Sequence, residues 1–364
     1  MDHHPAPLPP LAADEPATPV APAAPVASIA PGRQLLAQAV DLALEGTVVL
    51  SFSRLGYQWR DRLFGWSDLT ERPLHGKVAV VTGATSGLGF AAATRLASLG
   101  ASVRLVGRDL ERTERARDRI VADTGNAHVE VGVADLARLD DVRRYAEQLR
   151  TTHDRLDVLI NNAGALVRDH ELTVDGIELT AQTHVVAPFL LTHELLGLLG
   201  RTPGARVITV SSGGMYTQRL DLDRLDREST AGSHPDFDGV ASYALAKRSQ
   251  VVLNGRWAER AADTGITFHA MHPGWVDTPG VQTSLPDFAR VMGPWLRTPF
   301  QGADTMVWLA AARAPLEVNG RFWLDRHQRW PVKVPWTRTA PDDADRLWRW
   351  VERRAGIDPA QSSP

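Results

Sequence analysis

Short apolar runs alternate with longer amphipathic stretches through most of the chain, from Lys77 to about Met271. The expected strands are residues 77–82, 102–106, 128–133, 158–161, 206–211 and 267–271, with helices at 88–99, 110–122, up to about 152, up to about 199, and 242–262. Strands that are apolar throughout are typical of parallel sheets covered by helices on both faces. The pattern therefore predicts an α/β fold with a single doubly wound parallel sheet over residues 73–335.

The segments outside this alternation have their own patterns. Residues 1–31 are rich in proline and alanine and are expected to form a disordered tail, because they can bury little apolar surface. Residues 32–72 show a helical apolar stripe, interrupted by Gly46 and Gly56, and predict an N-terminal helical arm. The arm either packs on the main domain or lies in a membrane interface. Residues 336–364 predict a helical, Trp-rich C-terminal extension, with tryptophans that are buried or form an oligomer face.

Composition excludes several classes of function. The net charge of -3 gives no reason to expect a nucleic-acid partner. The chain has no cysteine, so disulfides and thiolate zinc sites are excluded, and no metal site is expected. We find no uncharged apolar run of about 18 residues and therefore expect no membrane span. A cytoplasmic protein is predicted, and peripheral membrane contact and a homo-oligomer are left open.

A glycine-rich turn follows the first expected strand and opens a helix. In TGATSGLG, Gly83 permits a tight turn, Gly87 lets a pyrophosphate approach the backbone, and Gly89 permits close helix–strand packing. The free N–H groups of the helix start favour an anion. This context predicts a dinucleotide-binding Rossmann domain with Thr85, Ser86 and Leu88 also in the loop.

The end of the second expected strand bears on the choice of cofactor. An acid at this place binds a ribose 2′-hydroxyl, whereas an arginine accommodates a 2′-phosphate. The sequence VRLVGRD puts Arg108 there, and Asp109 comes one residue late, where it is expected to cap the next helix. We therefore expect NADP(H) in preference to NAD(H), with NAD-dependent alcohol dehydrogenation as an alternative.

Tyr243 and Lys247 stand four residues apart in YALAK and so share one face of a helix. A tyrosine with an ordinary pKa of about 10 is a poor acid–base group at neutral pH. A neighbouring ammonium and an oxidised nicotinamide both favour the phenolate and lower that pKa. The pair alone carries little information, and its weight depends on the motifs around it.

Several motifs accompany the pair in a fixed order. The glycine spacing G-x-x-x-G-x-G, NNAG at 161–164, VSS ending at Ser212, Y-x-x-x-K and PGWVDT together resemble the short-chain dehydrogenase/reductases. Longer segments, such as FDGVASYALAKRSQVVLNGRWA, resemble one subgroup of that family. The resemblance implies that Ser212 polarises the substrate oxygen and that Ser211 is structural. It also implies cofactor contacts from Asp135, Leu136, Asn162, Ala163, Gly164, Tyr243, Lys247, Pro273, Gly274, Val276 and Thr278.

One position departs from the family pattern. Where the family usually places an Asn that distorts the long helix and holds a water in the proton relay, this chain has His184, and Ala187 replaces a Gly. A histidine can hydrogen-bond a water in either tautomer, so His184 either serves the relay or is a packed side chain. Pro188 could distort the helix in another way.

These features predict an enzyme that interconverts a carbonyl and an alcohol of a small molecule by hydride transfer, with Tyr243 as general acid/base. The alternative is a cofactor-binding regulatory or scaffold protein with little catalysis, motivated by His184 and the two extensions. Trp275, Met215 and Phe237 suggest a moderately apolar substrate. The segment 215–240 reads as an inserted, solvated surface or a partial lid.

Overall fold

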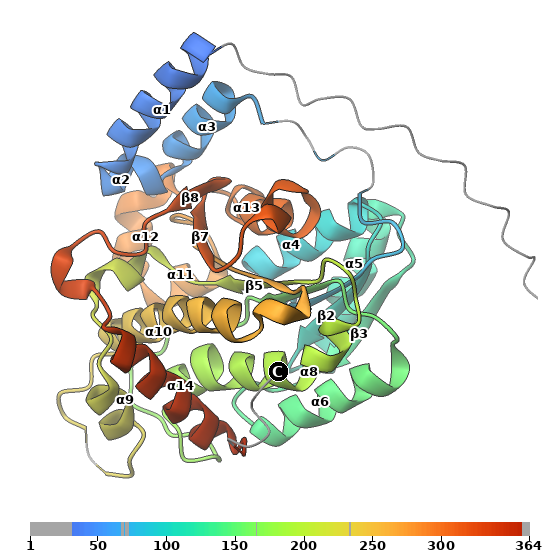
Figure 1. Cartoon of the computed structure of the whole chain (residues 1–364), viewed down its shortest axis with the longest axis vertical. Helices are drawn as coiled ribbons and strands as arrows, with labels where there is room; N and C mark the ends of the chain where they lie inside the picture. Colours follow the sequence, from blue (N-terminus) through green and yellow to red (C-terminus); the bar gives the residue numbers. More distant parts are fainter. Residues whose placement is uncertain (1–30, 67–68, 70–72, 165, 233, 359–364) are drawn as a thin grey trace, which may run out of the picture.

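An eight-stranded sheet organises the chain in the computed structural model, which describes residues 31–66, 69, 73–164, 166–232 and 234–358 (Figure 1). The tail predicted over residues 1–31 lies, apart from Pro31, outside the described residues. The strand order is β3-β2-β1-β4-β5-β6-β7-β8, and all neighbours are parallel except β7 and β8. The strands are β1 (Val78–Thr82), β2 (Ser102–Gly107), β3 (Val129–Val133), β4 (Val158–Asn161), β5 (Arg206–Val210), β6 (Thr267–Met271), β7 (Arg321–Leu324) and β8 (His327–Arg329).

The predicted doubly wound α/β fold is confirmed, and the six expected strands are found. The hairpin of β7 and β8 was not predicted. Its two turn residues, Asp325 and Arg326, have φ of 52° and 59°, a conformation that usually selects Gly or Asn, so the sequence carried no turn signal.

Helices cover both faces of the sheet. One face carries α4 (Gly87–Ser98), α5 (Leu110–Thr124) and α13 (Pro299–Ala311). The other carries α6 (Leu139–Thr152), α8 (Ala187–Gly200), α10 (Gly239–Arg260) and α14 (Pro341–Ala355). Shorter helical elements are α7 (Leu179–Ala181), the π-helical turn η1 (Gln182–Val186), η2 (Gly213–Thr217), α9 (Leu222–Glu228), η3 (Ala262–Thr264), α11 (Pro279–Ser284), α12 (Pro286–Met292), η4 (Gly293–Trp295), η5 (Ala314–Glu317) and η6 (Pro335–Thr337).

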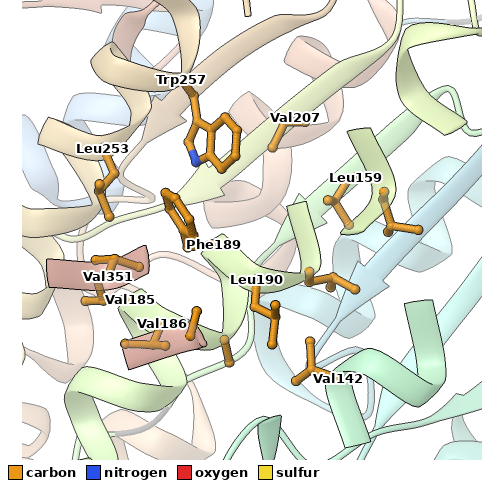
Figure 2. Packing of buried hydrophobic residues seen from close by; sticks show 14 of the residues in the cluster. Val142, Leu159, Val185, Val186, Phe189, Leu190, Val207, Leu253, Trp257 and Val351 are labelled. Atoms are coloured by element: carbon orange, nitrogen blue, oxygen red, sulfur yellow. The ribbon is translucent and has the colours of Figure 1, made fainter. Parts of the chain in front are cut away.

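The C-terminal helix α14 closes the larger core cluster. Figure 2 shows Phe189 of α8 beside Trp257 of α10, with ring centroids 4.7 Å apart, and Trp348 of α14 meets the same phenylalanine at 4.7 Å. The expectation of buried tryptophans holds for Trp348 and Trp350, whereas Trp330 and Trp336 are mostly exposed.

The predicted N-terminal helical arm is present as α1 (Pro31–Glu45), α2 (Val48–Phe52) and α3 (Arg54–Phe64). As expected, α1 ends before Gly46. The expected break at Gly56 is wrong, because Gly56 lies inside α3. A Cβ at this position would come within 2.3 Å of the Leu50 carbonyl oxygen, so glycine is needed for the close approach of α2 to α3.

One helical stretch in the described part of the chain, Leu179–Gly200, is long and apolar enough to cross a membrane by length and composition. It is also the stretch whose residues fill the larger core cluster, between α6, α10 and α14. Its apolarity is therefore accounted for by packing against the sheet.

Candidate active site

The glycine loop and the NNAG motif meet where the strand order reverses, between β1 and β4, which is the usual ligand position in such sheets. A Cβ on Gly83, where φ is 66°, would lie 2.8 Å from the Cα of Ala163. A Cβ on Gly89 would lie 2.3 Å from the Gly83 carbonyl oxygen and 2.5 Å from Nδ2 of Asn162. The two glycines therefore permit a contact between two backbone segments that side chains would prevent.

Thr82, a residue that the motif reading did not single out, ties these segments together. Its hydroxyl accepts hydrogen bonds from the backbone N–H groups of Asn162 and Ala163, both at 3.0 Å, and donates to the Ile160 carbonyl at 3.2 Å. The Asn162 amide in turn donates to the Thr82 carbonyl at 2.8 Å. Thr82 thus joins the end of β1 to the segment that follows β4, and both segments border the proposed cofactor site.

The first N–H groups of α4 have no side-chain cap. Ser86 precedes the helix but makes no side-chain capping bond, so the first N–H groups are not satisfied by it. Gly87 has a φ of 55°, and a Cβ there would be 3.4 Å from Cγ2 of Thr278, in the PGWVDT turn. The glycine loop and that turn therefore face each other, and these residues fit a bound dinucleotide.

The end of β2 lies beside the glycine loop. A Cβ on Gly107 would approach Cγ2 of Thr85 to 2.8 Å, and the next residue, Arg108, is exposed. Asp109 accepts from the backbone N–H of Arg112 at 2.8 Å, which confirms its predicted role as the cap of α5. Arg108 therefore stands at the rim of the loop, with its neighbour Asp109 already engaged.

Asp135 and Leu136 follow β3, the next strand outward from β2. Asp135 is half-buried and its Oδ1 accepts from the backbone N–H of Ala137 at 3.0 Å. Leu136 is buried, and its carbonyl accepts from Nε2 of Gln182 at 3.5 Å. Both residues therefore lie on the same side of the switch point as Arg108.

Tyr243 and Ser212 are brought together from α10 and the end of β5. Burial raises the pKa of Tyr243, and a hydrogen bond with the Ser212 hydroxyl works in the opposite direction. Ser212 also accepts from the Gly214 N–H at 3.3 Å. The adjacent Ser211 is buried, and its hydroxyl donates to the Lys247 carbonyl at 2.9 Å, which holds α10 against β5.

Lys247 is buried one helical turn beyond Tyr243. Its Nζ donates to the Val210 carbonyl at 2.7 Å and lies 5.4 Å from the centroid of the Tyr243 ring. Burial lowers the pKa of Lys247 to about 7. We expected an adjacent ammonium to lower the pKa of Tyr243. Among the protein's own groups, burial instead raises the pKa of Tyr243.

His184 lies in the π-helical turn, where the sequence predicted a distorted helix. Pro188 has no N–H for the carbonyl four residues earlier, and that carbonyl, on His184, accepts instead from Nε2 of Gln250 at 2.7 Å. The His184 ring is buried and stands edge-on to Tyr243, with centroids 5.2 Å apart at 88°. It also fills the space that a Cβ on Gly164 would need. Gln250, three residues after Lys247, was not identified from the sequence.

The PGWVDT turn leaves β6 and packs on α13 and on the N-terminal arm. Val276 is buried and pairs with Arg297 in an isolated parallel bridge. Trp275 meets Phe288 of α12 at 5.3 Å. Met215, which was expected near the substrate pocket, is completely buried in a cluster with Phe52 and Tyr216 and cannot line a pocket.

Comparisons with known proteins agree with this geometry. The family described as short chain dehydrogenase matches residues 77–219. Dehydrogenase/reductase SDR family member 12 of Bos taurus is 41% identical over 295 residues, covering 81% of this chain and 90% of that protein. Retinol dehydrogenase 12 of Bos taurus is 33% identical, covering 77% and 86%. The solved structure of the Pseudomonas aeruginosa RhlG/NADP active-site complex is 26% identical, covers 70% of this chain and 96% of that one, and superposes with a TM-score of 0.56. The subgroup resemblance noted from the sequence is thereby confirmed.

Proposed function

Because the chain belongs to the short-chain dehydrogenase/reductase family and is therefore an oxidoreductase acting on CH–OH and C=O groups, we propose that it interconverts a carbonyl and an alcohol with NADP(H). The observation that carries the proposal is the grouping around Tyr243, where Lys247 Nζ lies 5.4 Å from the tyrosine ring centroid and the Ser212 hydroxyl is close enough to lower the pKa of the phenol. Two hydroxyls that reach each other can also donate to one oxygen atom placed between them. A carbonyl oxygen that develops negative charge needs such a pair of donors.

The proposed reduction divides the work among three side chains. NADPH, when bound, supplies the hydride that adds to the carbonyl carbon. Tyr243 transfers its hydroxyl proton to the carbonyl oxygen as the C=O π electrons move onto that oxygen, and Ser212 donates a hydrogen bond to the same atom. The tyrosinate then regains a proton from solvent. Because the pKa of Lys247 is lowered to about 7, its side chain is an ammonium in some molecules and a neutral amine in others near neutral pH.

The residues that would hold the cofactor lie on both sides of the switch point. We propose that the N–H groups at the start of α4 bind the pyrophosphate and that Asp135 and Leu136 contact the adenine. Arg108 is exposed beside the glycine loop, where a guanidinium can pair with a 2′-phosphate. This placement supports NADP(H) over NAD(H).

His184 is proposed to take part in the proton relay, since its ring is edge-on to Tyr243. His184→Asn restores the residue that the family usually has, and His184→Phe keeps an aromatic ring without nitrogen. We expect the Asn variant to retain turnover and the Phe variant to shift the pH profile of kcat. Equal profiles in all three proteins would assign His184 to packing against Gly164.

A moderately apolar substrate is proposed on two grounds. Trp275 is only partly buried and lies at the turn that follows β6, beside Phe288 of α12. One relative is a retinol dehydrogenase, which is named for an apolar alcohol. The proposal predicts that a panel of aldehydes and ketones gives turnover with apolar members, and turnover only with small charged carbonyls would contradict it.

The deciding experiment separates binding from catalysis. The protein is titrated with NADPH and NADH by cofactor fluorescence, and NADPH oxidation is then followed with the carbonyl panel for the wild type and Tyr243→Phe. We expect tight NADPH binding by both proteins and turnover by the wild type alone. Tight binding without turnover of any carbonyl or alcohol would instead favour a cofactor-binding regulatory protein.

The remaining expectations on partners and location stay predictions. The side chains of Val48, Val49 and Leu50 on α2 are about half exposed, which keeps membrane-surface contact open. Co-sedimentation with liposomes tests this contact, and size-exclusion chromatography with light scattering tests a homo-oligomer. Cell fractionation tests the cytoplasmic location.

A further inference from the structure

The N-terminal arm reaches the two segments that carry the proposed chemistry. Phe52, the last residue of α2, is 3% exposed and lies between the segment after β5 and the turn after β6. Its ring packs so closely on Gly213 that a Cβ there would lie 2.6 Å from Cε2 of Phe52. The same ring meets His272 edge-on, with centroids 4.4 Å apart, and Trp275 at 5.9 Å.

The backbone of the arm holds the turn as well. The Phe52 carbonyl accepts from the Trp275 N–H at 2.8 Å and from Nε of Arg297 at 3.0 Å. Gly274, with a φ of 76°, could not carry a Cβ, which would lie 2.6 Å from that carbonyl oxygen and 2.5 Å from the Arg297 guanidinium. Arg297 also donates to the Pro273 carbonyl at 3.1 Å. The turn after β6 therefore packs directly against the backbone of the arm.

A buried chain of ions fastens the arm in this position. Arg297 pairs with Asp325 at 2.5 Å, Asp325 with Arg60 of α3 at 2.6 Å, and Arg60 with Asp41 of α1 at 2.6 Å. Asp41 then meets Arg329 of β8 at 2.7 Å. Breaking a buried pair leaves an uncompensated charge, so such a cluster resists separation of the arm from the sheet.

We propose that the arm is a component of the reaction centre, with Phe52 as the positioning residue that fixes the Ser212 segment and the PGWVDT turn relative to each other. This inference rests on the proposed function, because it takes that turn to hold the nicotinamide. An arm serving only as an attachment to another surface would not need a ring wedged between these two segments. The matching glycines, Gly213 and Gly274, are each placed where any side chain would displace Phe52 or its carbonyl.

The test compares two ligands that share one half. NADPH spans the whole proposed site, whereas 2′,5′-ADP carries only the adenosine half, which lies on the Arg108 side. For Phe52→Ala and the milder Phe52→Leu, we expect an unchanged Kd for 2′,5′-ADP, a Kd for NADPH raised about tenfold, and kcat reduced by roughly ten- to a hundredfold. Phe64→Ala, the same change in the same arm where the ring packs on His327 of β8, should leave all three values near those of the wild type.

The outcomes separate this inference from the proposed function. If the wild type does not bind NADPH, the proposed function fails. If the wild type binds NADPH and both Phe52 variants leave the ratio of the two Kd values unchanged, the positioning role is refuted. Loss of both affinities in Phe52→Ala together with an unchanged ratio in Phe52→Leu would mean a purely structural arm, and would also refute it.

Discussion

Replacing Lys247 by methionine is expected to stabilise the protein at neutral pH while removing its activity. The chain contains 40 lysines and arginines, and only three of them are lysines, at 77, 247 and 333. Lysine is the one of the two that can lose its charge when buried. Lys247 is one of these three, so its amino group can adopt the neutral form that burial favours.

The magnitude follows from the depressed pKa. The gap between the ordinary value of 10.5 and about 7 costs folding roughly 4 kcal/mol at pH 7, because the unfolded chain binds the proton more tightly. This cost is fully present below pH 7 and disappears as the pH rises toward 10.5. Methionine has similar bulk but loses the bond from Nζ to Val210, worth about 1–2 kcal/mol. Lys247→Met should thus be about 2–3 kcal/mol more stable than the wild type at pH 7 and equal or slightly less stable at pH 10.

Urea denaturation of both proteins at pH 6, 7, 8.5 and 10 measures this difference. Lys247→Arg is the opposite control, since an arginine cannot deprotonate and should destabilise at every pH. Lys77→Met repeats the change at a partly exposed site and should show little pH-dependent difference. With three lysines, 13C labelling at Cε also reports the pKa of Lys247 directly. A variant less stable than the wild type at pH 7, with no dependence on pH, would refute the reasoning.

Three further predictions concern the loop, the rim and the ion cluster. Arg108→Ala should weaken NADPH binding by about ten- to a hundredfold and NADH binding much less, as measured by cofactor fluorescence, and an unchanged affinity for NADPH would favour NAD. Gly89→Ala forces a Cβ toward the Gly83 carbonyl, so NADPH binding should be lost and urea stability should fall by about 1–3 kcal/mol. Asp325→Asn should destabilise by about 3–5 kcal/mol because it leaves Arg297 poorly compensated. Since the pKa of Asp325 is lowered from 3.8, this difference should be full above about pH 4 and shrink in stronger acid.

The sheet and the binding motifs could be predicted from sequence because they depend on local signals. Apolar runs located β1 to β6, and the glycine loop and Tyr243 followed from short spacings. Contacts between distant segments left no such signal. Thr82 is one ordinary letter of the glycine motif, yet its hydroxyl joins β1 to the segment after β4. The hairpin of β7 and β8 lacks the glycine that its turn would normally show.

The arm shows the same limit more clearly. Its helical stripe was visible, but the reason for Gly56 was not, because the group that excludes a side chain there is the Leu50 carbonyl of a separate helix. Arg60 and Asp325 are 265 residues apart and pair only in the fold. From the sequence alone, a charged residue in an amphipathic stretch such as that of Arg60 is predicted to face solvent, because its distant partner is unknown. Met215 gave the converse error, since an apolar residue beside a motif can point into the core.

Burial shifts the pKa values of Tyr243 and Lys247 in opposite directions, and these shifts connect the proposed proton relay with the arm. The same loss of solvent raises the pKa of Tyr243 and lowers that of Lys247, so the protein by itself favours two neutral groups. Phenolate and ammonium together become favourable only if the donors around Tyr243 are held in place, since a misplaced donor cannot stabilise a buried charge. We propose Ser212 as that donor, and the adjacent Gly213 packs against the ring of Phe52. On the proposed mechanism the acidity of Tyr243 depends on how firmly the arm is held, and we therefore expect kcat to respond to Phe52 more strongly than the affinity for the adenosine half.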